Sequence, residues 1–115
     1  MKLDREINKN GKGKYAVVRL RGIEDGDEAY LCLKRLEELG HLDWGLTGQQ
    51  DEFFVIKLRD RFADAALRAY SKAVMAAAGK CKEFDESKEL AQYALSVQKL
   101  ESRAGTLSPF CKTPD

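Results

Sequence analysis

Apolar and polar side chains alternate in two short segments of the chain, residues 15–21 and residues 53–59. An alternation with a period of two predicts β-strands, because successive side chains of a strand point to opposite faces. A shorter alternation within residues 41–47 leaves open whether that segment is a third strand or a loop. If it is a strand, we expect it to pair with residues 53–59 as a hairpin.

Three longer segments repeat apolar side chains every three or four residues, which predicts three helices over residues 25–39, 60–79 and 85–103. We expect Asp60 and Asp85 to cap the second and third helices, since aspartate accepts hydrogen bonds from the first backbone N–H groups. The second helix is rich in alanine, which lets another backbone approach closely, so we expect it to pack on more than one side. Helical spacing gathers apolar residues on one face of the second helix (Phe62, Ala66, Ala69, Tyr70 and Ala73) and of the third (Leu90, Tyr93, Ala94, Val97 and Leu100).

The order β-α-(β)-β-α-α predicts an α+β protein. Its sheet has three strands, or two if residues 41–47 are a loop, with a βαβ-type crossover and a C-terminal helical hairpin as its cover. We expect a flexible basic arm over residues 1–14, a single α+β domain over residues 15–105 and a tail over residues 106–115.

Composition describes a globular chain of 115 residues with a net charge of +1, from 20 basic and 19 acidic side chains. This near-balance argues against strong non-specific binding to nucleic acid or membranes. No apolar run reaches the roughly 18 residues that span a bilayer, and the charged N-terminus is unlike a signal peptide. Three widely spaced cysteines without an export signal indicate free thiols, so we expect a cytoplasmic protein.

Few residues have the spacing of a catalytic or metal-binding motif. His41 follows a helix end, where a surface histidine is the simpler interpretation than a general base. Cys32, Cys81 and Cys111 lack the short spacing of structural zinc sites, and Cys32 falls on an apolar helix face typical of a core residue. We therefore expect no catalytic residue, no metal site and no cofactor.

The strands predicted over residues 15–21 and 53–59 share one pattern on alternate positions: aromatic, valine, basic, basic. If the strands are parallel neighbours, the aromatic side chains gather at one end of a sheet face and the basic ones at the other. Trp44, in a glycine-flanked segment, is a further candidate contact, although a core-edge position is the simpler interpretation. The candidate binding residues are Tyr15, Arg19, Arg21, Trp44, Phe53, Lys57 and Arg59.

Three interpretations of this face remain open. The helical hairpin covers it, so that its apolar half is ordinary core; or it closes against a second copy in a homo-oligomer; or its aromatic side chains stack on bases while the basic ones hold phosphates. The sequence lacks the glycine-aromatic motif of a common RNA-binding sheet, which disfavours nucleic acid.

Three segments, KYAVVRLR (residues 14–21), DEFFVIKLRD (residues 51–60) and SPFCKTPD (residues 108–115), resemble a group of small bacteriophage proteins with no established activity. The resemblance implies a phage accessory or counter-defence factor in the host cytoplasm, and it supplies no functional residues. We expect a non-enzymatic interaction protein, acting as a homo-oligomer on a host protein or a small anionic ligand. The alternative is a nucleic-acid or nucleotide-binding protein that uses the aromatic-basic sheet face. A membrane partner is not expected.

Overall fold

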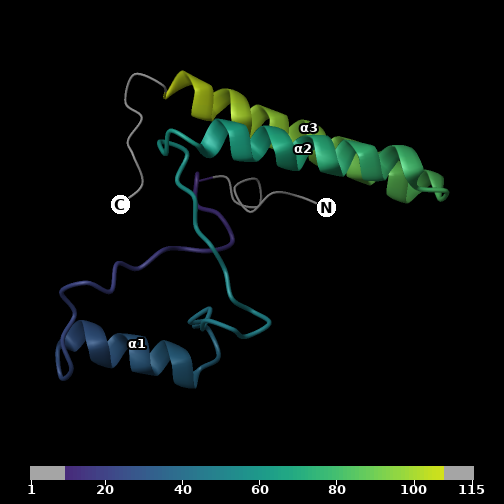
Figure 1. Cartoon of the computed structure of the whole chain (residues 1–115). Helices are drawn as coiled ribbons and strands as arrows, with labels where there is room; N and C mark the ends of the chain where they lie inside the picture. The colour runs from purple at the N-terminus through teal and green to yellow at the C-terminus, as the bar shows by residue number, and fades with distance from the viewer. Residues whose placement is uncertain (1–9, 108–115) are drawn as a thin grey trace. The chain divides into compact units, whose positions relative to one another are not determined.

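The computed structural model describes residues 10–107 and shows three helices, α1 (Glu28–Glu38), α2 (Ala63–Lys80) and α3 (Phe84–Thr106) (Figure 1). Over that range the chain forms no strand. The described chain is therefore all-α, and the predicted α+β fold, with its small sheet and βαβ-type crossover, is wrong. The three predicted helices are confirmed to within three residues at each end.

The segments predicted as strands are irregular chain with both of their alternating rows exposed. In the first segment Tyr15 is 68% exposed and Val18, from the opposite row, is 49% exposed. Phe53 and Phe54, from the two rows of the second segment, are also exposed. Alternation determines which side chains share a face, but a strand also needs a neighbour to pair its backbone N–H and C=O groups. No such ladder forms within residues 10–107, and residues 41–47 are likewise irregular.

The chain divides into two compact units, which we describe separately. The first is Val17–Val55 and contains α1. The described residues of the second are 10–16 and 56–107, which include α2 and α3. Most of the predicted arm (residues 1–14) and of the predicted tail (residues 106–115) lies outside the described residues.

Helix α1 ends in a Schellman turn, as the glycine after it allows. Gly40 has a positive φ of 78°, its N–H donates to the carbonyl of Glu37 (3.0 Å), and the N–H of His41 donates to the carbonyl of Leu36 (2.9 Å). These two bonds satisfy carbonyls that the helix end leaves unpaired. Within this unit Leu33 is the buried side chain.

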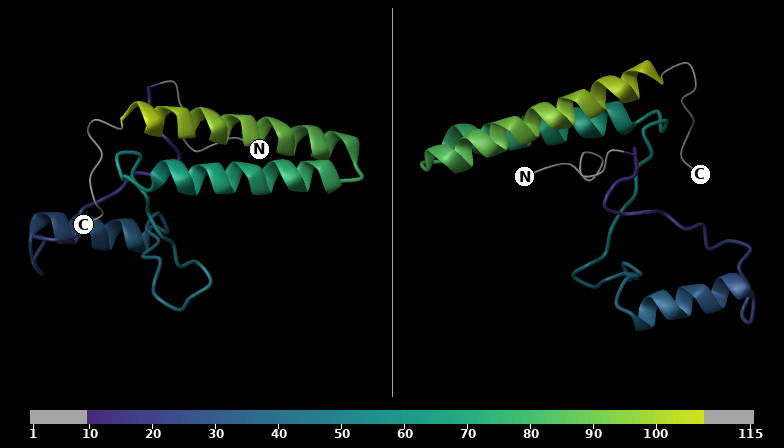
Figure 2. Two further views of the ribbon diagram at one scale, coloured as in Figure 1. Left: turned by 45° about the horizontal axis from the view of Figure 1, so that its top comes forward. Right: turned by 180° about the vertical axis from the view of Figure 1, so that it is seen from behind.

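Helices α2 and α3 lie side by side as an antiparallel hairpin in both views of Figure 2. The small side chains of Ala63, Ser71 and Ala78 from α2 are buried with those of Ala94, Val97 and Ala104 from α3. The predicted apolar face of α3 is thereby confirmed, because Ala94 and Val97 belong to it. The predicted face of α2 is instead exposed, since α3 packs on a neighbouring stripe of the same helix. Alanines line both stripes, so periodicity alone did not distinguish them.

The caps of the hairpin differ from those predicted. Glu83, not Asp85, precedes α3, and its carboxylate accepts hydrogen bonds from the backbone N–H groups of Asp85 (3.0 Å) and Glu86 (2.8 Å). Phe62 precedes α2, and the carboxylate of Asp60 accepts from the Phe62 N–H at 2.8 Å. Acidic residues therefore do stabilise both helix starts, but Asp60 acts from the turn before α2, and the cap of α3 lies two residues earlier than expected.

Candidate functional site

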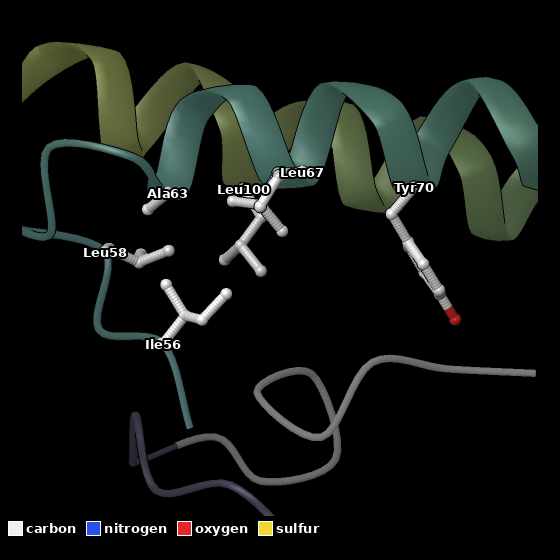
Figure 3. A pocket seen from close by; sticks show the side chains of 7 residues that line it. Ile56, Leu58, Ala63, Leu67, Tyr70 and Leu100 are labelled. Atoms are coloured by element: carbon white, nitrogen blue, oxygen red, sulfur yellow. The ribbon is translucent and has the colours of Figure 1, made fainter. Parts of the chain in front are cut away.

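An apolar groove lies along one side of the α2–α3 hairpin, within a single unit of the chain. Its volume is about 310 Å³. Figure 3 shows Ile56 and Leu58, from the chain before α2, pointing toward Leu67 of α2 and Leu100 of α3. The lining consists of aliphatic side chains and one aromatic ring: Ile56, Leu58, Ala63, Ala66, Leu67, Tyr70 and Leu100.

The groove continues along the hairpin as a surface of small residues. Ala66 and Tyr70 line the groove, and Ala73 and Ala77 follow them at the spacing of one helical stripe. All four are exposed. We call this surface, with Leu100 from α3, the groove face. Its side chains along α2 are apolar and, apart from the ring of Tyr70, small.

The side of the hairpin away from the groove is polar. Arg68 donates to Asp64 on its own helix at 3.0 Å and pairs with Glu101 of α3 at 3.5 Å. Lys72 lies one turn further along the same stripe of α2 and is exposed. On α2 the apolar groove face and this charged stripe, which we call the charged back, therefore lie on opposite sides of the helix.

The predicted binding residues are divided between the two units of the chain. Tyr15, Lys57 and Arg59 belong to the unit that contains the hairpin, and all three are exposed. The ammonium of Lys14 lies 5.4 Å from the centre of the Tyr15 ring. Arg19 and Arg21, also exposed, belong to the other unit. Without a sheet, the alternation that was to align these side chains on one face has no structural counterpart among residues 10–107.

Trp44 and Phe53, the two remaining candidates, belong to the unit of α1. The indole N–H of Trp44 donates to the carboxylate of Glu37, which fixes the chain after α1 to its last turn. The ring of Phe53 lies against Gly45 and occupies the place that a Cβ would take there. These contacts give both aromatic residues a structural role within their unit.

The residues considered for catalysis or metal binding are His41 and the three cysteines. Within residues 10–107, no group of three or more histidine, cysteine, aspartate or glutamate side chains is arranged to hold a metal ion. Cys32 is exposed, which contradicts its predicted place in a core, and Cys81 is half-buried; both thiols are free. Cys111 lies outside the described residues.

Sequence reasoning identified Tyr70 and Leu100 as apolar helix positions but did not identify a groove. Ile56 and Leu58 fall within the strand predicted over residues 53–59, and the apolar spacing of the second helix does not single out Leu67. The available signal was the alanine content of α2, which leaves room beside the helix for a second apolar surface.

Comparisons with known proteins add no assignment: no family model, no curated protein and no solved structure matches the chain. None of the helices within residues 10–107 combines the length and apolar character needed to cross a membrane.

Proposed function

We propose that this chain is a non-enzymatic interaction protein that forms a homodimer through the groove face of its α2–α3 hairpin. The observation that carries the proposal is the apolar surface formed by the groove and by Ala73 and Ala77, which follow it along α2. The side chains that line the groove include no carboxylate, thiol, imidazole or amine, so its chemistry suits packing rather than catalysis.

A second copy supplies the second layer of helices that one hairpin lacks. Two packed helices form one layer, and a stable helical core is normally built from at least two layers. Two hairpins stacked through their groove faces form a four-helix arrangement, in which each copy covers the apolar surface of the other. The alanines support this arrangement, because they allow a facing helix to approach closely.

The alternative of nucleic-acid binding depended on aromatic and basic residues sharing a sheet face. Residues 10–107 form no sheet, so that surface is not proposed. A role as a phage accessory factor, which the resemblance implies, is compatible with a compact dimer that binds a host protein stoichiometrically. The groove face itself is assigned to the second copy.

Light scattering of the full chain as it elutes from a size-exclusion column tests the proposal with two matched variants. Ala73→Glu places a charge at the centre of the groove face, and we expect the dimer dissociation constant to rise roughly 100-fold, because an unpaired charge is buried. Met75→Glu introduces the same charge on the opposite side of the same helix, about 160° around it from Ala73, where the native side chain is 38% exposed, and should leave the dimer intact. Equal behaviour of the two variants would contradict the proposal.

A further inference from the structure

We infer that the two copies pack antiparallel, about a two-fold axis that crosses the groove face at the level of Ala73 of α2 and of Ala94 of α3. This inference rests on the proposed function and specifies the orientation and register of the partner, a second copy of this chain. It follows from the level at which the two helices meet and from the charges on the groove side of α3.

Three contacts between α2 and α3 show which residues lie level with each other. Arg68 pairs with Glu101 at 3.5 Å, the hydroxyl oxygens of Tyr70 and Tyr93 lie 3.2 Å apart, and the Ser87 hydroxyl donates to the carbonyl of Ala78 at 2.7 Å. The mean position of these contacts is residue 72 on α2 and about residue 94 on α3. Ala73 and Ala94 therefore lie within about one residue of the same level of the hairpin, and one axis can pass at the level of both.

The charges of α3 are arranged symmetrically about that level. Asp85 and Arg103 lie nine residues on either side of residue 94, while Glu89 and Lys99 lie five residues on either side. Glu89 and Leu100 are about three helical turns apart and therefore lie on the same line along the surface of α3. Asp85, Lys99 and Arg103 lie next to this line, on the side away from α2. In an antiparallel pair of α3 helices, each acidic residue then faces a basic residue of the second copy.

These four side chains have no competing ionic partner among residues 10–107 of their own chain. All four are exposed, and none forms an ion pair with another described residue. A two-fold axis parallel to the helices would instead stack α3 of one copy on α2 of the other, so these acidic and basic residues of α3 would not meet. The charge pattern therefore favours the antiparallel dimer.

The alanines of α2 obey the same symmetry. Ala69 and Ala77 lie four residues on either side of Ala73, so that each faces the other across the axis. Tyr70 then faces Ala76 of the second copy, which places a large ring opposite a small side chain. One axis thus satisfies both helices.

Charge reversal tests the ion pairs. Lys99→Glu turns two symmetry-related attractions into repulsions, and the dissociation constant should rise roughly 10- to 30-fold. Adding Glu89→Lys to the same chain restores opposite charges and should return the constant to the wild-type value. Lys72→Glu, the same change on the charged back, should have no effect. Failure of the double variant to recover would overturn the register.

Disulfide cross-linking tests the position of the two-fold axis directly. It uses a full-length chain in which Cys32, Cys81 and Cys111 are changed to serine. Ala73→Cys places two thiols beside each other at the axis, and a disulfide-linked dimer should form under mild oxidation. Ala66→Cys, on the same face, separates the two thiols by about 21 Å along the helices and should not cross-link. Cross-linking of both variants, or of Ala66→Cys alone, would overturn the antiparallel register while leaving dimerisation intact. A chain that is monomeric throughout would overturn the proposed function as well.

Discussion

Tyr70 of α2 and Tyr93 of α3 meet edge to face, with ring centroids 6.2 Å apart, planes inclined at 80° and hydroxyl oxygens 3.2 Å apart. The pair joins the two helices at the rim of the groove. Edge-to-face rings and a shared hydroxyl hydrogen bond both stabilise such a contact. It therefore connects the stability of the hairpin to the shape of the groove face.

We expect the two tyrosines to be energetically coupled. In a double-mutant cycle with Tyr70→Phe and Tyr93→Phe, the hydroxyl bond is lost only once, so the coupling free energy should be about 0.5–1.5 kcal/mol. Urea unfolding followed by circular dichroism measures it. Strictly additive effects of the two substitutions would show that the hydroxyl groups do not interact.

Val97 should dominate the hydrophobic contribution of α3, because its side chain is only 1% exposed. Val97→Ala removes two buried methyl groups and should lower the free energy of unfolding by about 1–3 kcal/mol. Leu95→Ala, on the same helix but 51% exposed, serves as the control and should cost less than half as much. If both variants lost the same free energy of unfolding, Val97 would not be a core residue of the hairpin.

Glu83 stabilises the start of α3 through two backbone hydrogen bonds. Glu83→Ala should lower the free energy of unfolding by about 1 kcal/mol, since both N–H groups lose their acceptor. Glu83→Gln keeps one acceptor oxygen and should recover part of the loss. Lys82→Ala, the neighbouring substitution, should be close to neutral in the same thermal unfolding experiment. A neutral Glu83→Ala variant would contradict the cap.

Gly45 is held in its turn by two independent constraints, a positive φ of 57° and the adjacent ring of Phe53. Gly45→Ala should displace the ring and alter the fluorescence of Trp44, the single tryptophan of the chain. Gly48 also has a positive φ, but a Cβ added there would meet open space. Gly48→Ala therefore imposes backbone strain of about 1 kcal/mol without a clash and should leave the emission spectrum nearly unchanged. Identical spectra for both variants would contradict the Phe53 contact.

The sequence was sufficient to predict the three helices, because their apolar residues recur at a spacing that a helix satisfies within itself. The end of α1 was also predictable in outline, since Gly40 supplies the left-handed conformation that its Schellman turn needs. A strand differs in that it depends on a neighbour. The alternation around Val17 and Val55 had no such neighbour among the described residues, so the predicted sheet did not form.

The candidate site was less accessible to sequence reasoning for a related reason. Periodicity identifies Ala66, Tyr70 and Ala73 as one stripe of a helix, but it does not say whether α3 covers that stripe or the neighbouring one. Alanine is small enough to suit either. Only the arrangement of the hairpin shows that Ala63 and Ala78 pack inward while the groove face stays exposed.

Sedimentation equilibrium on the unmodified full chain is the most direct test of self-association through the hairpin. The account predicts a mass near twice 12.9 kDa at micromolar concentrations, with dissociation toward the single-chain mass on dilution. A mass of 12.9 kDa that does not change with concentration would contradict it.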